Sequence, residues 1–185
     1  MTSRIGAVRG DVLAIEVLES GGGRVIDEIV VNLPSDDLLD LMVNEVHAID
    51  GVSVEDVRPV EGVYSDGGLM ALVVAAELAE AERPKRLSTL IEGVVRLTEA
   101  EWAMVVHEDA VVESRGEVPT PDWITSLLAG SRHLGDPHAA SGDMFWADLP
   151  GTNLWVAAGR SNRPVHDRER VRLDLFVRIA DSLLT

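Results

Sequence analysis

Three pairs of short apolar runs, the two runs of each pair separated by a turn, constrain the fold of this chain most. The pairs are residues 12–18 with 25–33, 102–108 with 110–115, and 143–149 with 153–159. The turn of the first pair contains three consecutive glycines, which adopt positive φ at little cost. Strands joined by short turns pair antiparallel. The sequence therefore predicts an α+β fold in which antiparallel sheets are flanked by helices.

Helical patterns fill most of the chain around these pairs. They cover residues 36–50, 69–82, 87–100, 121–129 and 167–184. Ser35 can cap the first of them with its hydroxyl. In the last one an apolar residue recurs at every fourth position, which predicts a stripe facing the core: Val171, Leu175, Ile179 and Leu183. Residues 52–58 alternate between apolar and polar side chains and predict one more strand.

Charge is distributed unevenly along the chain. Residues 1–82 hold 17 acidic and 4 basic side chains, whereas residues 83–185 hold 15 and 12. A step of this size is typical of two modules with different surfaces. Residues 61–68 are rich in glycine and small polar side chains, which favours a joint there. We predict two domains, residues 1–62 and 69–185, joined by a linker over residues 63–68.

The overall acidity of the chain excludes several partners. Its 185 residues carry 16 basic and 32 acidic side chains, a net charge of −16. Phosphate backbones and anionic lipids bind clustered Lys and Arg, so neither a nucleic acid nor a membrane is expected as a partner. The longest apolar run, residues 69–76, is too short to span a membrane, and no leader segment is evident, so we expect a cytoplasmic protein. The sequence has no cysteine, which excludes disulfides and thiolate chemistry.

No catalytic constellation is evident in the sequence. His133, Asp136 and His138 include donor types of a metal site, but Gly135 and Pro137 indicate a simple turn, which we favour. Adjacent acidic residues on a strand point to opposite faces and cannot converge on one atom. Neither a nucleophile-elbow motif nor a phosphate-binding loop occurs. We therefore predict no catalytic residue, no metal site and no cofactor.

The first module carries a family resemblance. Gly10-Asp11-Val12, the first hairpin, the run VVNLP, a helix and the ending IDGVSVEDVRPVEG follow one another. This succession resembles an ACT domain, a small ferredoxin-like regulatory fold of order βαββαβ that binds amino acids in many metabolic enzymes. Residues 5–10 resemble the last turn of its first helix, and its first strand and the acidic-x-Pro-Gly turn have no counterpart here. A sheet without that strand exposes an edge to which a partner chain can pair, so the resemblance implies a homodimer.

The ACT resemblance also implies a ligand site. In that family the stretch between the first helix and the second strand lies at the dimer interface, where backbone groups meet the carboxylate and the ammonium of an amino acid. This places Gly10, Asp11 and Val12 at the ligand, with the Asp11 carboxylate as acceptor for the ammonium. The alternative is a turn in which Asp11 hydrogen-bonds to its own backbone.

The second module ends with LWVAAGR at residues 154–160, RPVHD at residues 163–167 and Glu169. This ending, after helices and two strand pairs, resembles a GAF domain, and both modules together resemble a stand-alone actinobacterial ACT protein. Arg160 can bind a carboxylate or phosphate there, and the alternative is an ion pair with Asp167 or Glu169. Trp155 can line an apolar ligand pocket, and the alternative is core packing.

These observations predict a non-catalytic regulatory protein. It would bind an amino acid or a similar small molecule through its ACT-like module and signal by a conformational or oligomeric change. The alternative is a protein–protein interaction module that uses its acidic N-terminal surface without a ligand. A third hypothesis is an enzyme that uses Arg160 with His107 or His166.

Overall fold

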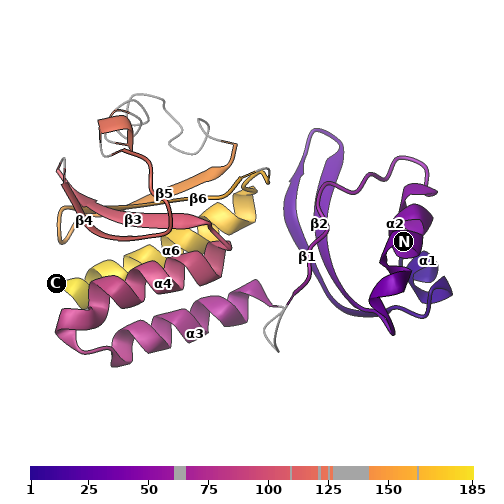
Figure 1. Ribbon diagram of the computed structural model, residues 1–185, viewed down its shortest axis with the longest axis horizontal. Coiled ribbons are helices and arrows are strands. Elements are labelled where there is room, and N and C mark those ends of the chain that lie inside the picture. The colour runs from indigo at the N-terminus through magenta and orange to yellow at the C-terminus, as the bar shows by residue number, and fades with distance from the viewer. Residues whose placement is uncertain (61–65, 109, 121, 125, 127–141, 162) are drawn as a thin grey trace. The chain divides into compact units, whose positions relative to one another are not determined.

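The computed structural model describes residues 1–60, 66–108, 110–120, 122–124, 126, 142–161 and 163–185 (Figure 1). The chain divides into two compact units, Met1–Asp66 and Gly67–Thr185, and the division falls inside the expected connecting segment. Each unit combines helices with an antiparallel sheet, so the α+β class is confirmed. Among the described residues, no helix is long and apolar enough to cross a lipid bilayer.

Unit 1 (Met1–Asp66) is built around one long hairpin. Strand β1 (Asp11–Gly21) pairs antiparallel with strand β2 (Arg24–Asn32). Gly22 and Gly23 form the turn with φ values of 57° and 76°, which glycine adopts without strain. The first hairpin predicted from the sequence is therefore confirmed.

Helices lie on both sides of this hairpin in the sequence. Helix α1 (Thr2–Ala7) precedes it, and the 3₁₀ turn η1 (Asp36–Leu38) and helix α2 (Leu39–His47) follow it. The Ser35 hydroxyl accepts a hydrogen bond from the amide of Asp37 at 3.4 Å, which confirms the expected helix cap. Helix α1 packs against both α2 and the start of β1.

Residues 52–58 do not form a strand, so that prediction was wrong. A strand exists only where its backbone groups meet those of a neighbour, and the described sheet of unit 1 consists of β1 and β2 alone. The segment is attached to β2 through Arg58, whose guanidinium forms an ion pair with Glu28. Alternation of side chains indicated a strand, but alternation does not supply a pairing partner.

Unit 2 (Gly67–Thr185) contains a four-stranded antiparallel sheet in the order β4-β3-β6-β5. Its strands are the two predicted pairs: β3 (Trp102–His107) with β4 (Ala110–Arg115), and β5 (Met144–Leu149) with β6 (Leu154–Gly159). The central strands β3 and β6 are almost continuous apolar runs, as expected where both faces of a sheet are covered. The edge strand β4 instead alternates between exposed and half-buried side chains over most of its length.

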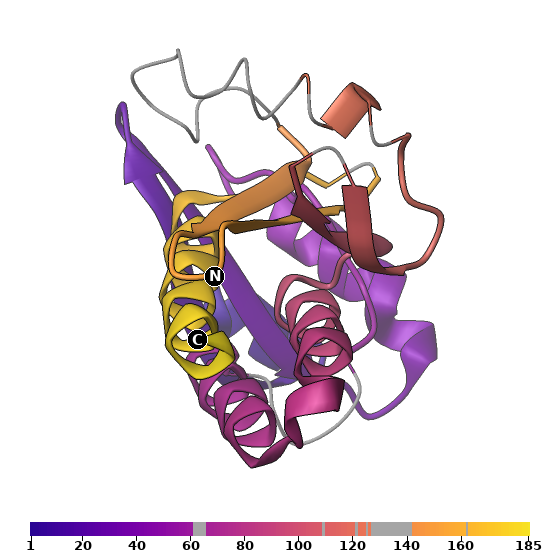
Figure 2. The same cartoon turned by 90° about the vertical axis from the view of Figure 1, so that its left-hand side faces the viewer.

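Three helices cover one face of this sheet in two layers (Figures 1 and 2). Helices α4 (Arg86–Thr98) and α6 (Asp167–Leu184) pack against the strands. Helix α3 (Gly67–Glu80) packs against α4 and α6 on the side away from the sheet, and the short turn η2 (Arg83–Lys85) joins α3 to α4. The main core lies between these layers and includes Leu78, Leu90, Val94, Phe145, Val156 and Phe176.

The opposite face of the sheet carries a second apolar cluster. It consists of Met104, Val106, Ile124, Met144, Trp146 and Ala157. Ile124 comes from the predicted helix over residues 121–129, of which 122–124 and 126 are described and helical. The other positions of that segment lie outside the described residues.

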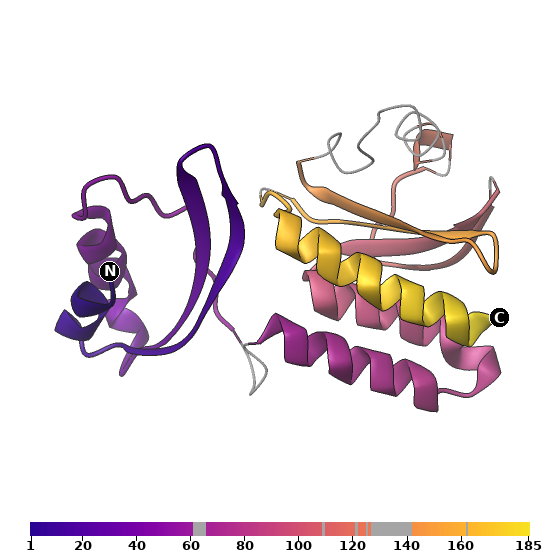
Figure 3. The ribbon, with the colours of Figure 1, turned by 180° about the vertical axis from the view of Figure 1, so that it is seen from behind.

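Helix α6 lies against the sheet on the same side as α3 and α4 (Figure 3). It turns a different side to the core than the one predicted. Val171, Leu175 and Ile179 are exposed, and Leu183 is half-buried. The buried apolar positions are Leu173, Phe176, Val177 and Ala180. The predicted stripe was wrong because apolar residues recur at helical spacing on both sides of this helix, and spacing alone does not select the buried side.

Candidate functional site

The outer side of the hairpin in unit 1 presents apolar side chains between carboxylates. We call this the hairpin surface, and it consists of Asp11, Leu13, Ile15 and Val17 of β1 with Val25 and Asp27 of β2. Leu13 is 62% exposed and Ile15 is 55% exposed. Asp11 is the first exposed residue of β1 and pairs with Asn32, and Asp27 lies directly opposite Val17. The pairing register shifts between Val12 and Ala14, so a bulge separates Asp11 from Ile15 and Val17. The surface therefore offers an apolar strip with an acidic group near each end.

The three N-terminal residues of the predicted site are placed by this same hairpin. Val12 pairs with Val31 and is half-buried, whereas Asp11 is exposed at the first position of β1. The Gly10 amide donates to the Ile5 carbonyl at 3.0 Å and thereby ends helix α1. The backbone donor expected to receive a ligand carboxylate is thus already used inside the protein.

Gly10 occupies its position because a larger residue does not fit. A Cβ there would lie 2.8 Å from Cγ2 of Ile5 and 3.0 Å from Cγ1 of Val31. Among the described residues, no hydrogen bond reaches the Asp11 carboxylate, and the expected alternative of a bond to its own turn is not observed there. The Asp11 carboxylate is therefore available to a ligand.

Unit 1 has an excess of negative charge around the hairpin surface. Its 66 residues include 14 acidic and 4 basic side chains. Two of the basic residues form ion pairs, Arg4 with Glu45 at 2.8 Å and Arg58 with Glu28. An excess of carboxylates attracts cations, and dissolved salt screens that attraction.

In unit 2, Arg160 forms an ion pair rather than an open anion site. The residue is 4% exposed, and its Nη1 and Nη2 atoms donate to the two Glu169 oxygens at 2.8 and 2.7 Å. The same guanidinium donates to the carbonyls of Thr98 at 2.8 Å and Pro164 at 2.7 Å. It also lies 5.2 Å from the centroid of the Phe145 ring. Of the two alternatives, the geometry favours the ion pair, and with Glu169 rather than Asp167.

The environment of Glu169 shifts its titration. Burial by itself raises the pKa of this carboxyl, but the hydrogen bonds and the positive charge of Arg160 outweigh burial and hold the pKa below its ordinary value. The amide of His166 also donates to Glu169, at 3.0 Å. This network fastens the start of α6 to the end of β6, so its role is structural.

Trp155 lies on the sheet face opposite to Arg160. It is half-buried and packs against the cluster that contains Met104 and Trp146, whereas Arg160 lies over Phe145 in the main core. Trp155 and Arg160 therefore do not converge, and Gly10, Asp11 and Val12 belong to unit 1. Within unit 2, Trp155 and Arg160 do not form one site.

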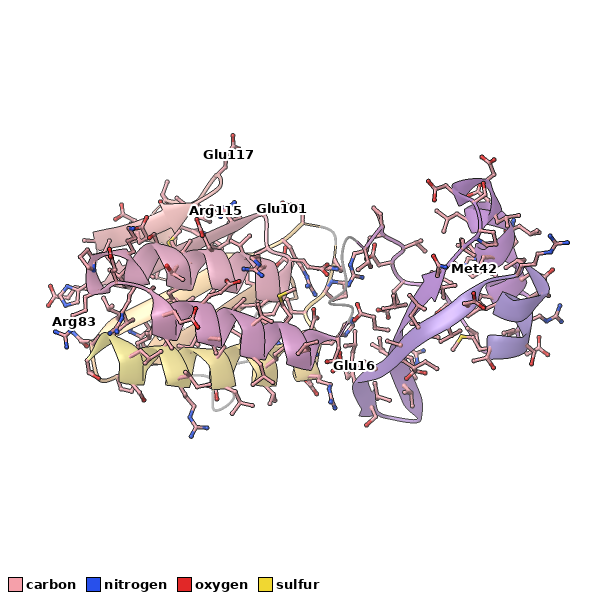
Figure 4. All side chains as sticks on the ribbon, turned by 90° about the horizontal axis from the view of Figure 1, so that it is seen from below. Glu16, Met42, Arg83, Glu101, Arg115 and Glu117 are labelled. Carbon is pink, nitrogen blue, oxygen red and sulfur yellow. The ribbon has the colours of Figure 1, made fainter. Side chains whose placement is uncertain are left out.

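An open pocket of about 430 Å³ occurs elsewhere in unit 2, and no sequence pattern predicted it. Its lining is formed by Glu101, Trp102, Glu117 and Ser161. Figure 4 shows Glu101 and Glu117 on the same side of the unit. The Ser161 hydroxyl donates to Glu101 at 2.7 Å. The β3–β4 hairpin places these glutamates at one pocket although they are 16 residues apart in the sequence, and no local sequence pattern predicts this.

The histidines proposed for chemistry are placed as follows. His166 is buried and caps α6, where its side chain accepts from the Glu169 amide. His107 is half-buried at the last position of β3. His133, Asp136 and His138 lie outside the described residues. Within the described part of the chain, no group of three or more metal-ligating side chains occurs.

Comparison with known proteins adds no relative: no family model, no curated protein and no solved structure matches this chain.

Proposed function

We propose that this protein is a non-catalytic regulatory protein whose unit 1 binds, on the hairpin surface, a ligand with a cationic group beside an apolar body. An amino acid with an aliphatic side chain is the first candidate. The proposal rests on one observation: the exposed Asp11 carboxylate lies at the end of an exposed aliphatic row.

The spacing of this row suits such a ligand. Exposed residues recur at every second position of β1 from Asp11 to Val17, although the pairing register with β2 shifts between Val12 and Ala14. Asp11 and Leu13 are consecutive exposed positions of this series, and one small molecule would contact both. The ammonium would pair with Asp11, and the aliphatic part would lie on Leu13 and Ile15. The acidity of unit 1 would favour approach of the cation.

The backbone next to Asp11 would also make the site selective between ligands with and without a carboxylate. The amide of Gly10, the residue before Asp11, donates to the Ile5 carbonyl. A ligand carboxylate would therefore gain no hydrogen bond from the Gly10 amide, and the negative potential of unit 1 would repel it. We expect an amide or a simple amine with the same side chain to bind as well as the amino acid or better.

The order of elements supports both family interpretations as proposals. Unit 1 has a helix, a hairpin and a second helix, which are the middle elements of an ACT-like order, whereas the closing strand of that order does not form over residues 52–58. Unit 2 has helices, a strand pair and a second strand pair before a long final helix, the order proposed for a GAF-like module. Binding at unit 1 would act by favouring one of two arrangements of the protein, in conformation or in oligomeric state.

A second candidate function is recognition of a basic protein segment. It is favoured by the length of the aliphatic row, since Leu13 to Val17 extends over about 14 Å, which is longer than one amino acid. An extended peptide that carries aliphatic residues flanked by basic residues at every second position would turn all of them to the hairpin surface, with a cation for Asp11 and for Asp27. This is the interaction-module alternative, with the hairpin surface as the contact.

Isothermal titration calorimetry of the full chain tests these candidates. The ligands are leucine, leucinamide, isoamylamine and a nine-residue peptide with arginine at positions 1 and 9, leucine at positions 3, 5 and 7, and serine between them. Asp11→Asn and Leu13→Ser should abolish binding of the true ligand class. Asp40→Asn and Leu41→Ser serve as matched controls, because both residues are exposed on helix α2 of the same unit.

The outcomes separate the candidates. Binding of the small amines that depends on Asp11 supports the regulatory proposal, and binding of the peptide alone supports the interaction module. Absence of binding by every ligand, or equal loss in the α2 controls, overturns both.

A further inference from the structure

The first ten residues of helix α3 are apolar on every side of the helix, although only one side packs against the other elements of unit 2. Its first ten residues, 67–76, include no charged side chain. Such helices are normally buried all round. Here α3 contacts α4 and α6 through Val74 and Leu78, while Leu72 on its outer side is 67% exposed.

The outer side of α3 divides into two chemically different halves. Leu69 and Leu72 project from the first half, and Ala76 and Ala79 occupy the second half. Steps of three and four residues place all four on one side of a helix. We call this set the α3 outer face. The four positions are symmetric about position 74. The two large side chains precede that position and the two small ones follow it.

We propose that the α3 outer face docks against the α3 outer face of a second copy of this chain, about a twofold axis at the level of Val74. A twofold contact requires a surface that is complementary to itself. In the antiparallel arrangement Leu72 lies opposite Ala76 of the second copy, and Leu69 lies opposite Ala79. Each leucine thus meets an alanine, and the contact occurs twice.

Charge restricts where two copies of so acidic a protein can meet. The net charge of −16 on each copy opposes association, so the contact needs a surface with few carboxylates, and the four residues of the α3 outer face carry none. At its end Glu80 would lie opposite Gly68 of the second copy. Gly68 is in the first turn of α3, where the helix dipole favours a negative group.

Neighbouring surface can enlarge the contact. Helix α6 packs beside α3 and exposes its own aliphatic stripe, Val171, Leu175 and Ile179. Stable interfaces bury more area than one helix provides, so we expect part of α6 to join the contact. This inference is independent of ligand binding at the hairpin surface.

Sedimentation equilibrium of the full chain over a dilution series tests the arrangement. Leu72→Ala leaves a gap opposite Ala76, and Ala76→Leu places two leucines against each other. Each variant alone should weaken the dimer by at least about tenfold. An equimolar mixture of the two variants restores a leucine–alanine pair at both contacts, so it should dimerise with an affinity within about threefold of the unmodified chain.

Two controls keep the result specific. Val112→Ala alters an exposed aliphatic residue of β4 and should leave the dimer unchanged. Circular dichroism should show that all variants fold, because positions 72 and 76 are exposed. A chain that stays monomeric at every concentration, single variants with unchanged affinity, or a mixture that does not recover would each overturn the proposal.

Discussion

Arg160 and Glu169 face each other inside unit 2 through two parallel hydrogen bonds of 2.8 and 2.7 Å. The arginine is almost fully enclosed, and the glutamate also receives the His166 amide at the first turn of α6. A pair in this position stabilises the junction between the last strand and the last helix. It also leaves each partner dependent on the other, because a buried charge without its partner is strongly unfavourable.

Arg160→Ala should therefore destabilise the protein by about 3–5 kcal/mol, since it leaves the Glu169 carboxylate buried without its cation. Arg115→Ala is the matched control: its ion pair with Glu92 is exposed on both sides, and exposed pairs contribute about 0–1 kcal/mol. Urea denaturation monitored by circular dichroism measures both. Equal effects would mean that the Arg160 pair is not buried as described.

The same pair predicts a specific acid sensitivity. Because the pKa of Glu169 is lower in the folded than in the unfolded protein, its contribution to stability is fully present above the ordinary pKa of about 4.5. That contribution is lost as the pH falls through the lowered folded-state pKa. Glu169→Gln should lose stability at pH 7 and show a smaller further loss between pH 5 and pH 3 than the unmodified protein. Urea midpoints at these pH values decide the matter, and parallel pH profiles would contradict the assignment.

The orientation of α6 can be tested with two leucines that are two positions apart. Leu173→Ala removes a buried side chain and should cost about 2–5 kcal/mol. Leu175→Ala alters an exposed one and should cost about 0.5 kcal/mol or less in the monomer. Thermal unfolding at a low protein concentration provides the comparison. The reverse order would restore the stripe predicted from the sequence.

Two glycines of unit 1 offer a matched pair for the packing beneath Asp11. Gly10→Ala introduces a Cβ that meets Ile5 and Val31, and we expect a loss of about 1–3 kcal/mol. Gly6→Ala introduces a Cβ into open space within α1, where alanine is the better helix former, so stability should be unchanged or rise by up to about 1 kcal/mol. Hydrogen exchange of the β1 and β2 amides reports the effect locally. Similar exchange in both variants would show that Gly10 is not tightly packed.

The individual strands and helices could be predicted from the sequence more accurately than the contacts between them. The three strand pairs could be predicted because glycine-rich turns and apolar runs are local signals that the hairpins retain. The strand over residues 52–58 could not be judged in this way, because a strand needs a neighbour and that neighbour is a property of the whole sheet. The buried side of α6 likewise depends on which side meets β5 and α4.

For the candidate sites, too, contacts between residues close in the sequence could be predicted, and contacts between distant residues could not. An ion pair between Arg160 and Glu169 could be foreseen as an alternative, since nine residues separate two complementary groups across one turn. The pocket lined by Glu101 and Glu117 could not, because the end of the β3–β4 hairpin creates it from distant positions. The exposure of the aliphatic row on β1 was also beyond reach, since apolar side chains in a strand are normally predicted to face a core.

The two units differ greatly in how much apolar surface they enclose. Among the described residues, unit 1 buries Ile5, Val8 and Val46, whereas all other buried apolar side chains belong to unit 2. Heating should therefore produce two calorimetric transitions, with the hairpin unit melting first while the larger unit stays folded. A ligand held at Asp11 would raise the temperature of the first transition alone. The melting temperature of unit 1 would then report ligand occupancy while unit 2 remains folded.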